Sequence, residues 1–340
     1  MPELGKGLER RGTIPTAIRK AGQRMGRKAR DTTNSTMRQI LVPLDDSELA
    51  AVVLPYVASI AERFHSKCLL YHVRETRPRW REGTLPIQIG GTTARTIREY
   101  LETVARRLSE QGIEVDTLIE PGNPAAKILQ TARSTNTDLL VIATHGHGGI
   151  GLWLFGSVAH RVVERVDTPL LLVRPTSHIP TTGSIEFRHL LLPVDGGKEG
   201  EAPLCWAIEF ARRYRATLHL LHVTPTLESL HTDSMTAAAI SPSLAGEILG
   251  AATEAAETYL QELSETIREK NISVEFEVRR GEPAEEILRS SHETAIDLIF
   301  MATHGRLGFG GAWYGSVVNK ILARFSTPLI LVRAPGTHQE

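Results

Sequence analysis

The stretch Asp138-Leu-Leu-Val-Ile-Ala-Thr-His-Gly146 decides the fold, because residues 297–305 repeat it as Asp-Leu-Ile-Phe-Met-Ala-Thr-His-Gly. In both places an apolar run of strand length enters a glycine-rich stretch, and a helical pattern begins at a Gly-Ser pair. Strands that are apolar throughout are typical of parallel sheets buried on both faces. The 340-residue chain therefore contains two copies of one α/β unit.

Other segments repeat in the same order. Ile40-Leu-Val-Pro-Leu-Asp45 returns 150 residues later as Leu190-Leu-Leu-Pro-Val-Asp195, whereas Gly156-Ser157 returns 159 residues later as Gly315-Ser316. The larger offset predicts an insertion in the second copy, around residues 224–249. We predict a basic, disordered tail at 1–36, a first domain at 37–175, a linker rich in Pro, Thr and Ser at 176–186, and a second domain at 187–335.

Strand-like runs in the first copy fall at about 39–44, 67–73, 113–119, 138–143 and 169–173, with helical periodicity between them. Ser47 is a candidate cap for the first helix. Short strands that alternate with helices predict a doubly wound, five-stranded parallel sheet in each copy. Such folds bind ligands beyond the carboxyl ends of their strands. We therefore look for function just after the first and fourth strands.

Composition excludes several classes of protein. Residues 1–36 hold nine of the 39 Lys and Arg but three of the 39 Asp and Glu, so the remainder is mildly acidic and a poor general binder of nucleic acid. Cys68 and Cys205 have no partners at metal-ligand spacing and are predicted to be buried thiols. No apolar run approaches a membrane span, and no secretory signal is evident. We expect a cytoplasmic protein.

The two loops share one spacing. Gly146 and Gly305 are each followed by nine residues and then by Gly156-Ser157 or Gly315-Ser316 at the start of a helix. Glycines let backbone N–H groups wrap an anion, and a helix N-terminus adds free donors and a favourable dipole. The serines can cap the helix or donate to a phosphate oxygen. No Lys follows the second glycine, so this is not a Walker A loop.

These motifs resemble the universal stress protein family, in particular the tandem members of its ATP-binding branch. The resemblance covers nearly all of both repeats and implies an adenine-nucleotide alpha hydrolase-like fold with strand order 3-2-1-4-5. It also implies an Asp after the first strand at the ribose or adenine, and backbone contacts to adenine after the second. The nucleotide-binding residues so implied are Pro43, Asp45, Val73, Ala143, His145, Gly146, Gly156, Ser157 and Val158, with Pro193, Asp195, Val223, Ala302, His304, Gly305, Gly315, Ser316 and Val317.

Both copies depart from the family loop at its first glycine, which is Ala143 or Ala302 here. One methyl group at that position would crowd the ribose or the phosphates, so we expect weaker binding that is nevertheless retained. The second copy also has Gly196-Gly197 where the first has Asp46-Ser47. If a single site is filled, we expect it to be the first.

Histidines and aromatic residues near the loops have plainer interpretations. His145, His147 and His304 lack a third ligand nearby in sequence, which argues against a dedicated metal site, and Mg²⁺ held by nucleotide phosphates is the more plausible ion. His72 and His222 lie inside apolar strands and are expected to be satisfied core residues. The loop aromatics are expected to pack the loop rather than to stack on a base, namely Trp153, Phe155, Trp313 and Tyr314.

The last apolar runs, Leu170–Val173 and Leu329–Val332, are predicted edge strands that must be paired or covered. In the family this strand makes the dimer contact, which implies that the repeats pair with each other or that two chains form a homodimer. The basic tail is either a disordered arm that touches acidic surfaces or nucleic acid, or an extension without function upstream of a start at Met37.

Three functions remain open at this point. The first is an ATP-binding stress or regulatory protein, with or without Mg²⁺, in which nucleotide biases dimer or partner contacts. The second is an enzyme, a nucleotide hydrolase or transferase that uses Asp45, Asp195 and the loop histidines; neither loop holds an evident base or arginine finger, so we expect slow hydrolysis at most. The third is an interaction module that has lost its ligand. Membrane binding is not expected.

Overall fold

The computed structural model describes residues 37–45, 50–75, 94–144, 156–175, 185–226, 242–303 and 316–334. Its contacts divide the chain into residues 1–36 and a unit from Met37 to Glu340. The predicted tail and Ser47 lie outside the described residues, so their predicted roles stay predictions.

Strands and helices alternate in the first copy as the sequence predicts. Its third strand begins and ends later than the predicted 113–119, and its first helix opens with a 3₁₀ turn, η1. The elements are β1 (Gln39–Pro43), η1 (Ala50–Val53), α2 (Leu54–Phe64), β2 (Lys67–Glu75), α3 (Ala94–Ser109), β3 (Val115–Gly122), α4 (Pro124–Ser134), β4 (Leu139–Ala143), α5 (Ser157–Arg165) and β5 (Leu170–Val173).

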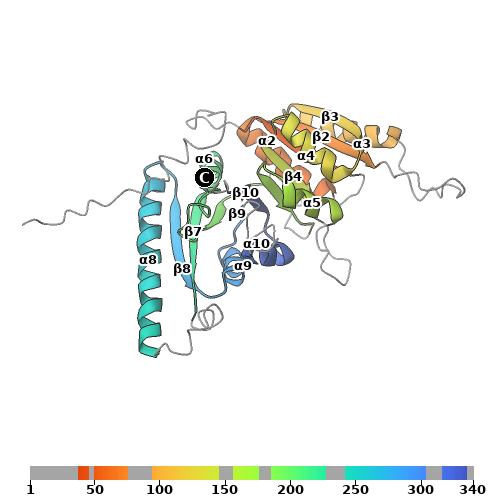
Figure 1. Ribbon diagram of the computed structural model, residues 1–340. Coiled ribbons are helices and arrows are strands. Elements are labelled where there is room, and N and C mark those ends of the chain that lie inside the picture. Colours follow the sequence, from red (N-terminus) through yellow and green to blue (C-terminus); the bar gives the residue numbers. More distant parts are fainter. Residues whose placement is uncertain are drawn as a thin grey trace, which may run out of the picture. The chain divides into compact units, whose positions relative to one another are not determined.

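The second copy repeats this order, with one long helix, α8, that runs beside β8 (Figure 1). This helix has 27 residues where its counterpart α3 has 16, so part of the predicted insertion is helical. The elements are β6 (His189–Pro193), α6 (Leu204–Tyr214), β7 (Thr217–Thr224), α8 (Pro242–Arg268), β8 (Val274–Arg280), α9 (Pro283–Glu293), β9 (Leu298–Thr303), α10 (Ser316–Arg324) and β10 (Leu329–Arg333).

All the strands form one sheet in the order β3-β2-β1-β4-β5-β10-β9-β6-β7-β8. Each copy thus has the predicted order 3-2-1-4-5, with parallel pairing inside the copy. The copies meet through β5 and β10, which are antiparallel. Leu171 pairs with Ile330, its own counterpart 159 residues on, so the seam has local two-fold symmetry. The two predicted edge strands therefore cover each other within one chain.

Local sequence explains where the helices begin. Asn123 precedes Pro124 and its side chain accepts a hydrogen bond of 3.2 Å from the Ala126 N–H, which caps α4. Glu282 takes the same place before α9, accepting from the Glu285 N–H at 3.0 Å. A side-chain acceptor at the cap followed by proline at the first helical position is a strong start signal. Both copies therefore turn from their third strand into a helix at the same point.

One core spans both copies on one face of the sheet. Apolar residues of α4, α5, α9 and α10 pack there with strand residues such as Leu172 and Leu331. On the other face, aromatic rings join the copies: Phe64 and Phe210 have centroids 4.8 Å apart, and Phe187 contacts Phe210. Helices on both faces follow from right-handed crossovers on either side of the first strand. The two copies are thus packed together as well as hydrogen-bonded.

The end of the predicted linker takes part in this packing. Ile185 and Phe187 are buried, and the Ser59 hydroxyl donates a 2.5 Å hydrogen bond to the Ile185 carbonyl. The same hydroxyl lies 2.9 Å from that of Tyr214, on α6 of the second copy. The chain is therefore held between α2 and α6 before it enters β6.

The two cysteines differ, against the prediction that both are buried. Cys68 is buried in β2, and burial raises the pKa of its thiol to about 12, which makes it unreactive. Cys205 is exposed. It follows Leu204 on α6, outside the stripe at three- and four-residue spacing that includes Ala207, Ile208 and Ala211. A helical pattern alone did not show which face the cysteine takes.

Candidate functional site

The sheet register brings the predicted residues of the first copy to one edge. Pro43 pairs with Tyr71 on β2, so Asp45 lies level with Val73, two residues further along both chains. Leu41 pairs with Leu140 on β4, which places Asp45 within one residue of the level of Ala143, the last residue of β4. Asp45 is exposed and Ala143 is partly exposed. Residues from three strands thus share the carboxyl edge where parallel sheets bind ligands.

The second copy has the same arrangement. Pro193 pairs with Leu221 on β7, which sets Asp195 level with Val223. Pairing of Leu191 with Ile299 brings the end of β9, with Ala302, to this edge. Asp195 is exposed, and Ala302 is partly exposed.

Gly156 forms the start of α5 as the loop motif predicts. Its φ of 71° and ψ of 145° lie in a region that other residues rarely adopt. It is the N-cap, without a side-chain capping bond, so Ser157 is the first helical residue rather than the cap. Ser157 is exposed, and Val158 behind it packs against the core together with Val73. In the second copy Ser316 begins α10 and is also exposed, and Val317 packs against the same core.

The remaining predicted loop residues lie outside the ranges that the structure describes. They are His145, Gly146, His304, Gly305 and Gly315, together with His147 and the four loop aromatics. Their contribution to a site stays a prediction.

In the second copy the side chain of Asp195 turns toward its own loop. Its Oδ1 accepts a 2.9 Å hydrogen bond from the Gly197 N–H, and Gly196 has a φ of 77°. A Cβ atom added at Gly200 would overlap this carboxylate, so the carboxylate lies against the loop backbone. The Gly196-Gly197 sequence thus gives the second copy a tight turn around its aspartate.

The histidines of the second strands differ between copies. His72 is buried and its Nδ1–H donates to the Leu44 carbonyl at 2.8 Å, which confirms a satisfied core histidine. His222 is only partly buried, and its Nδ1 has no hydrogen-bond partner among the described residues. Burial lowers the pKa of His222, and the charge of Asp195 opposes that shift. The prediction of a satisfied core histidine was therefore wrong for His222. This side chain packs near Tyr259 of α8, a contact that the sequence of its own strand does not reveal.

Tyr259 on α8 is the neighbour that the sequence did not reveal. Its ring lies edge-on to His222, with centroids 6.3 Å apart, and its hydroxyl donates to Glu201 at 2.8 Å. Burial and, next, the charge of Glu201 raise the pKa of this tyrosine. Asp195, Glu201, His222 and Tyr259 thus form a polar group near the carboxyl edge of the sheet in the second copy.

Asp138 and Asp297 open the repeated stretch of sequence, and each directly precedes a fourth strand. Each carboxylate accepts two backbone N–H bonds from the start of the neighbouring strand, Asp138 from Arg38 and Gln39 at 2.8 and 3.1 Å. Asp297 does the same with Arg188 and His189 at 2.7 and 2.9 Å. The sequence signal that could have identified them is the presence of the same residue, aspartate, at equivalent positions of both copies. These residues fix the register of the first and fourth strands.

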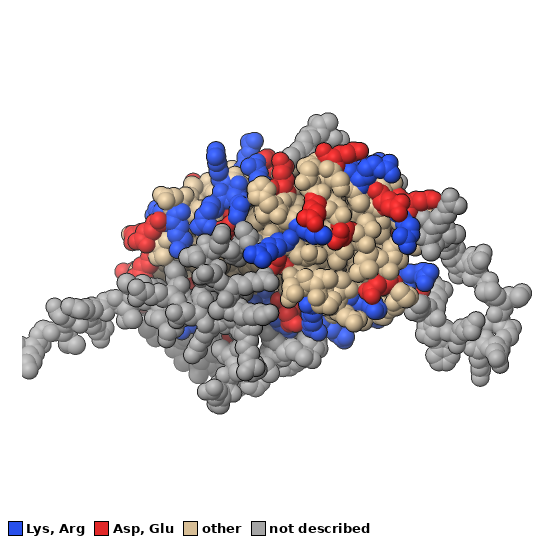
Figure 2. Space-filling view, turned by 90° about the horizontal axis from the view of Figure 1, so that it is seen from above, with Lys and Arg blue, Asp and Glu red and all other residues tan. Residues whose placement is uncertain are grey.

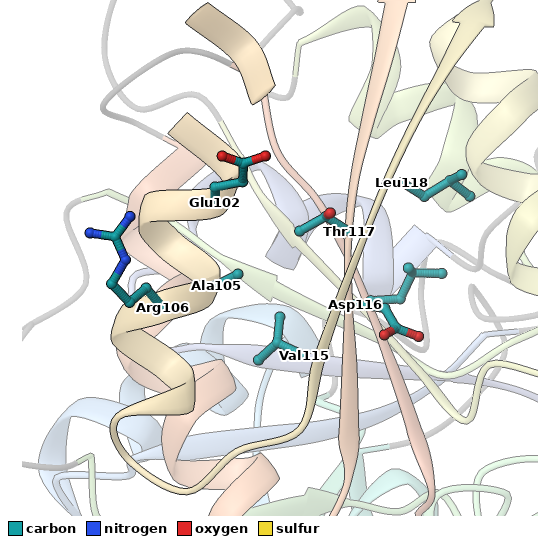
Figure 3. Close-up of a pocket in the computed structure, with 8 residues that line it drawn as sticks. Glu102, Ala105, Arg106, Val115, Asp116, Thr117 and Leu118 are labelled. Carbon is teal, nitrogen blue, oxygen red and sulfur yellow. The ribbon is translucent and has the colours of Figure 1, made fainter. Parts of the chain in front are cut away.

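A hollow of about 670 Å³ lies elsewhere, between α3 and the first half of β3. Glu102 and Arg106 line it from the helix, and Asp116 and Thr117 from the strand (Figure 3). It lies away from the carboxyl ends of β1 and β4, where folds of this kind bind ligands. We therefore do not assign the nucleotide to it. Its other lining residues are Leu69, Ala105, Val115 and Leu118.

The described residues on one face of the molecule form no extended patch of a single charge (Figure 2). Acidic and basic side chains are interspersed on the face shown in Figure 2. The described ranges hold no group of three or more His, Cys, Asp or Glu side chains that could bind a metal ion. Among the described helices, none is both long enough and apolar enough to cross a bilayer.

The fold defines a class: a tandem α/β protein whose two doubly wound, parallel halves join edge to edge in one sheet. The model of the universal stress protein family matches residues 36–174 and again 186–333, so the chain belongs to this family.

Similar proteins cover one copy or both. A universal stress protein from Mycolicibacterium smegmatis is 24% identical over 321 residues, which are 88% of this chain and 98% of that protein. Universal stress protein MJ0531 from Methanocaldococcus jannaschii is 28% identical over 140 residues, 40% of this chain and 82% of its own. The crystal structure of a universal stress protein from Archaeoglobus fulgidus matches with a TM-score of 0.63 at 19% identity, covering 88% of this chain and 97% of that one.

Proposed function

We propose that each copy binds an adenine nucleotide such as ATP at the carboxyl edge of its sheet, and that occupancy regulates contacts between chains or with partner proteins in the cytoplasm. The repeated geometry carries this proposal: Asp45 lies level with Val73 and within one residue of the level of Ala143, and Asp195 has the same relation to Val223 and Ala302. A loop and a helix N-terminus follow the fourth strand in both copies.

The available groups fit an adenine nucleotide. The exposed Ser157 and the free N–H groups of the first turn of α5 would hold phosphate oxygens, helped by the helix dipole. Asp45, exposed at the end of β1, would accept hydrogen bonds from ribose hydroxyls, and the backbone beside Val73 would take the adenine edge. Mg²⁺, if present, would be held mainly by the phosphates.

Equilibrium binding of labelled ATP to the purified chain tests this proposal. We expect saturable binding that is lost in the double variant Gly156→Val, Gly315→Val, because side chains there block the approach of the phosphates. Gly112→Val is a matched control, since Gly112 has a φ of 81° but lies in the turn between α3 and β3 with open space around it. Absence of binding at millimolar ATP would refute the proposal.

Two alternatives have distinct outcomes in the same preparation. Steady-state hydrolysis above about 1 s⁻¹ would indicate an enzyme rather than a regulator. Mass spectrometry of the purified protein without any co-purified nucleotide, together with no binding of added ATP, would indicate an interaction module without a ligand. We expect bound nucleotide and slow turnover at most.

A further inference from the structure

Two arginines cross the seam between the copies in opposite directions. Arg174 follows β5, and its Nη2 donates to the Leu322 carbonyl at 3.2 Å while its guanidinium lies 4.6 Å from the centroid of the Phe325 ring. Arg333 ends β10, and its Nη1 donates to the Val166 carbonyl at 3.4 Å and pairs with Asp167. Each arginine ends the same repeated motif, Thr-Pro-Leu-x-Leu-Val-Arg.

Both arginines contact the C-terminal end of a helix in the other copy. Leu322 is in the last turn of α10, and Val166 is the C-cap of α5. The last carbonyls of a helix have no partner within the helix, and a cation there interacts favourably with the helix dipole. Each copy thus supplies an arginine that donates a hydrogen bond to a carbonyl group at the C-terminal end of a helix in the other copy.

These two helices are the ones that begin at the proposed phosphate sites. α5 begins at Ser157 and α10 at Ser316, and each helix is nine residues long. Nine residues of α-helix span about 13 Å and move as a rigid rod. A change in tilt at the C-terminal end is therefore carried to the N–H groups that would face the phosphates.

The backbone of each arginine also lies beside the start of the loop in its own copy. The Val173 carbonyl, just before Arg174, accepts a 2.8 Å bond from the N–H of Thr144, where the first loop starts. The Ala334 N–H, just after Arg333, donates at 2.8 Å to Thr303, where the second loop starts. Each arginine thus links the start of the loop in its own copy to the end of a helix in the other copy.

We propose that Arg333 is a positioning residue for the nucleotide site of the first copy and Arg174 for that of the second, so that each site is held in place from the other copy. This inference rests on the proposed nucleotide binding. It predicts a crossed pattern: loss of an arginine weakens the site in the copy that does not contain it.

Single-site proteins test the crossed pattern. Gly315→Val leaves only the first site and Gly156→Val only the second, and each background receives Arg174→Met or Arg333→Met. By equilibrium ATP binding we expect Arg333→Met to weaken the first site about fivefold or more and to leave the second within about twofold, and Arg174→Met to do the reverse.

Two further variants separate positioning from general stability. Arg333→Lys keeps the charge opposite Asp167 and should recover most of the affinity of the first site. Arg133→Met removes a residue of the first copy that pairs with Asp167 at 2.9 Å without crossing the seam, and it should leave both sites unchanged. Losses that are equal at both sites, or that follow each arginine's own copy, overturn the inference. Failure of both single-site backgrounds and the parent protein to bind ATP refutes the proposed function and this inference with it.

Discussion

The first and second copies keep the same strand order but reverse a charge pair. In the first, Lys127 Nζ on α4 lies 3.6 Å from Glu120 on β3. In the second, Arg279 on β8 lies 3.7 Å from Glu286 on α9, with each partner 159 residues after its counterpart and of opposite sign. Attraction depends on the product of the charges, so both arrangements join strand to helix equally. The two copies therefore keep an ion pair at the same two positions, although the acidic and basic residues are exchanged.

The second pair is more deeply enclosed. The side chains of Arg279 and Glu286 are 15% and 9% exposed, against 33% and 28% for Glu120 and Lys127. Arg279 also binds Glu277 and Glu293, at 2.6 and 2.7 Å. The Tyr71 hydroxyl donates to Glu120 at 2.6 Å and lowers the pKa of that carboxyl. In the first copy the strand residue of the ion pair, Glu120, is thus also held by a tyrosine. In the second copy the strand residue, Arg279, is also held by two further carboxylates.

The seam should give the largest effect, because it is where the copies are most alike. Leu171 and Ile330 are fully buried and paired with each other. We expect Leu171→Ala and Ile330→Ala each to lower the free energy of unfolding by about 2–5 kcal/mol, and the double variant to be non-additive because the two residues are in contact. Denaturant titration measures all three. A large loss for one residue and none for the other would contradict the two-fold symmetry.

The reversed pair gives the next effect. Arg279→Met leaves Glu286 buried with Arg289 as its remaining ion partner, and we expect a loss of about 2 kcal/mol of unfolding free energy. Glu120→Gln affects the more exposed pair and keeps a hydrogen-bonding group, so a loss of about 1 kcal/mol or less is expected. Thermal and denaturant unfolding compare the variants. Equal losses would show that burial does not distinguish the two pairs.

Gly156→Ala should cost about 1–2 kcal/mol, because alanine is strained at a positive φ. Gly112→Ala carries similar strain in a turn remote from the crevice. We expect the two variants to have similar stabilities, measured by denaturant titration, and only Gly156→Ala to weaken ATP binding. Equal ATP affinities in the two variants would mean that the loop geometry does not serve a ligand.

The smallest effect is on the dependence of stability on pH. Burial lowers the pKa of both His219 and His222, whereas an unfolded histidine titrates near pH 6.5. As pH falls from about 7 to 5, the unfolded chain binds these protons before the folded chain does, so stability falls. We expect His219→Asn and His222→Asn to flatten this slope, as measured by unfolding at several pH values. The lowered pKa of Glu120 acts only in a more acidic range, below about pH 4.3. Slopes that match the parent protein in both variants would count against this account.

Much of the architecture could be predicted because it depends on local patterns. Apolar runs and repeated motifs gave the strands, and the Gly-Ser pair marked the start of α5 at Ser157. The predictions of side-chain burial and hydrogen bonding were wrong at positions where two secondary-structure elements pack together. The exposure of Cys205 depends on which face of α6 is buried. His222 packs near Tyr259 of α8, far away in sequence, and its Nδ1 has no hydrogen-bond partner within the described part of the chain.

By itself, the sequence determined that two α/β units follow one another and that their loops share one spacing, because periodicity and repetition are local properties of a chain. The tertiary structure was needed to show that β5 pairs with β10 inside the chain. It was also needed to show that Arg174 contacts the end of α10 and that Arg333 contacts the end of α5 across that seam. Pairing between distant segments depends on which surfaces are left uncovered after each sheet forms. The exposed edges and helix ends that pair in this way exist only after the chain has folded, so no single segment of the sequence specifies the pairing.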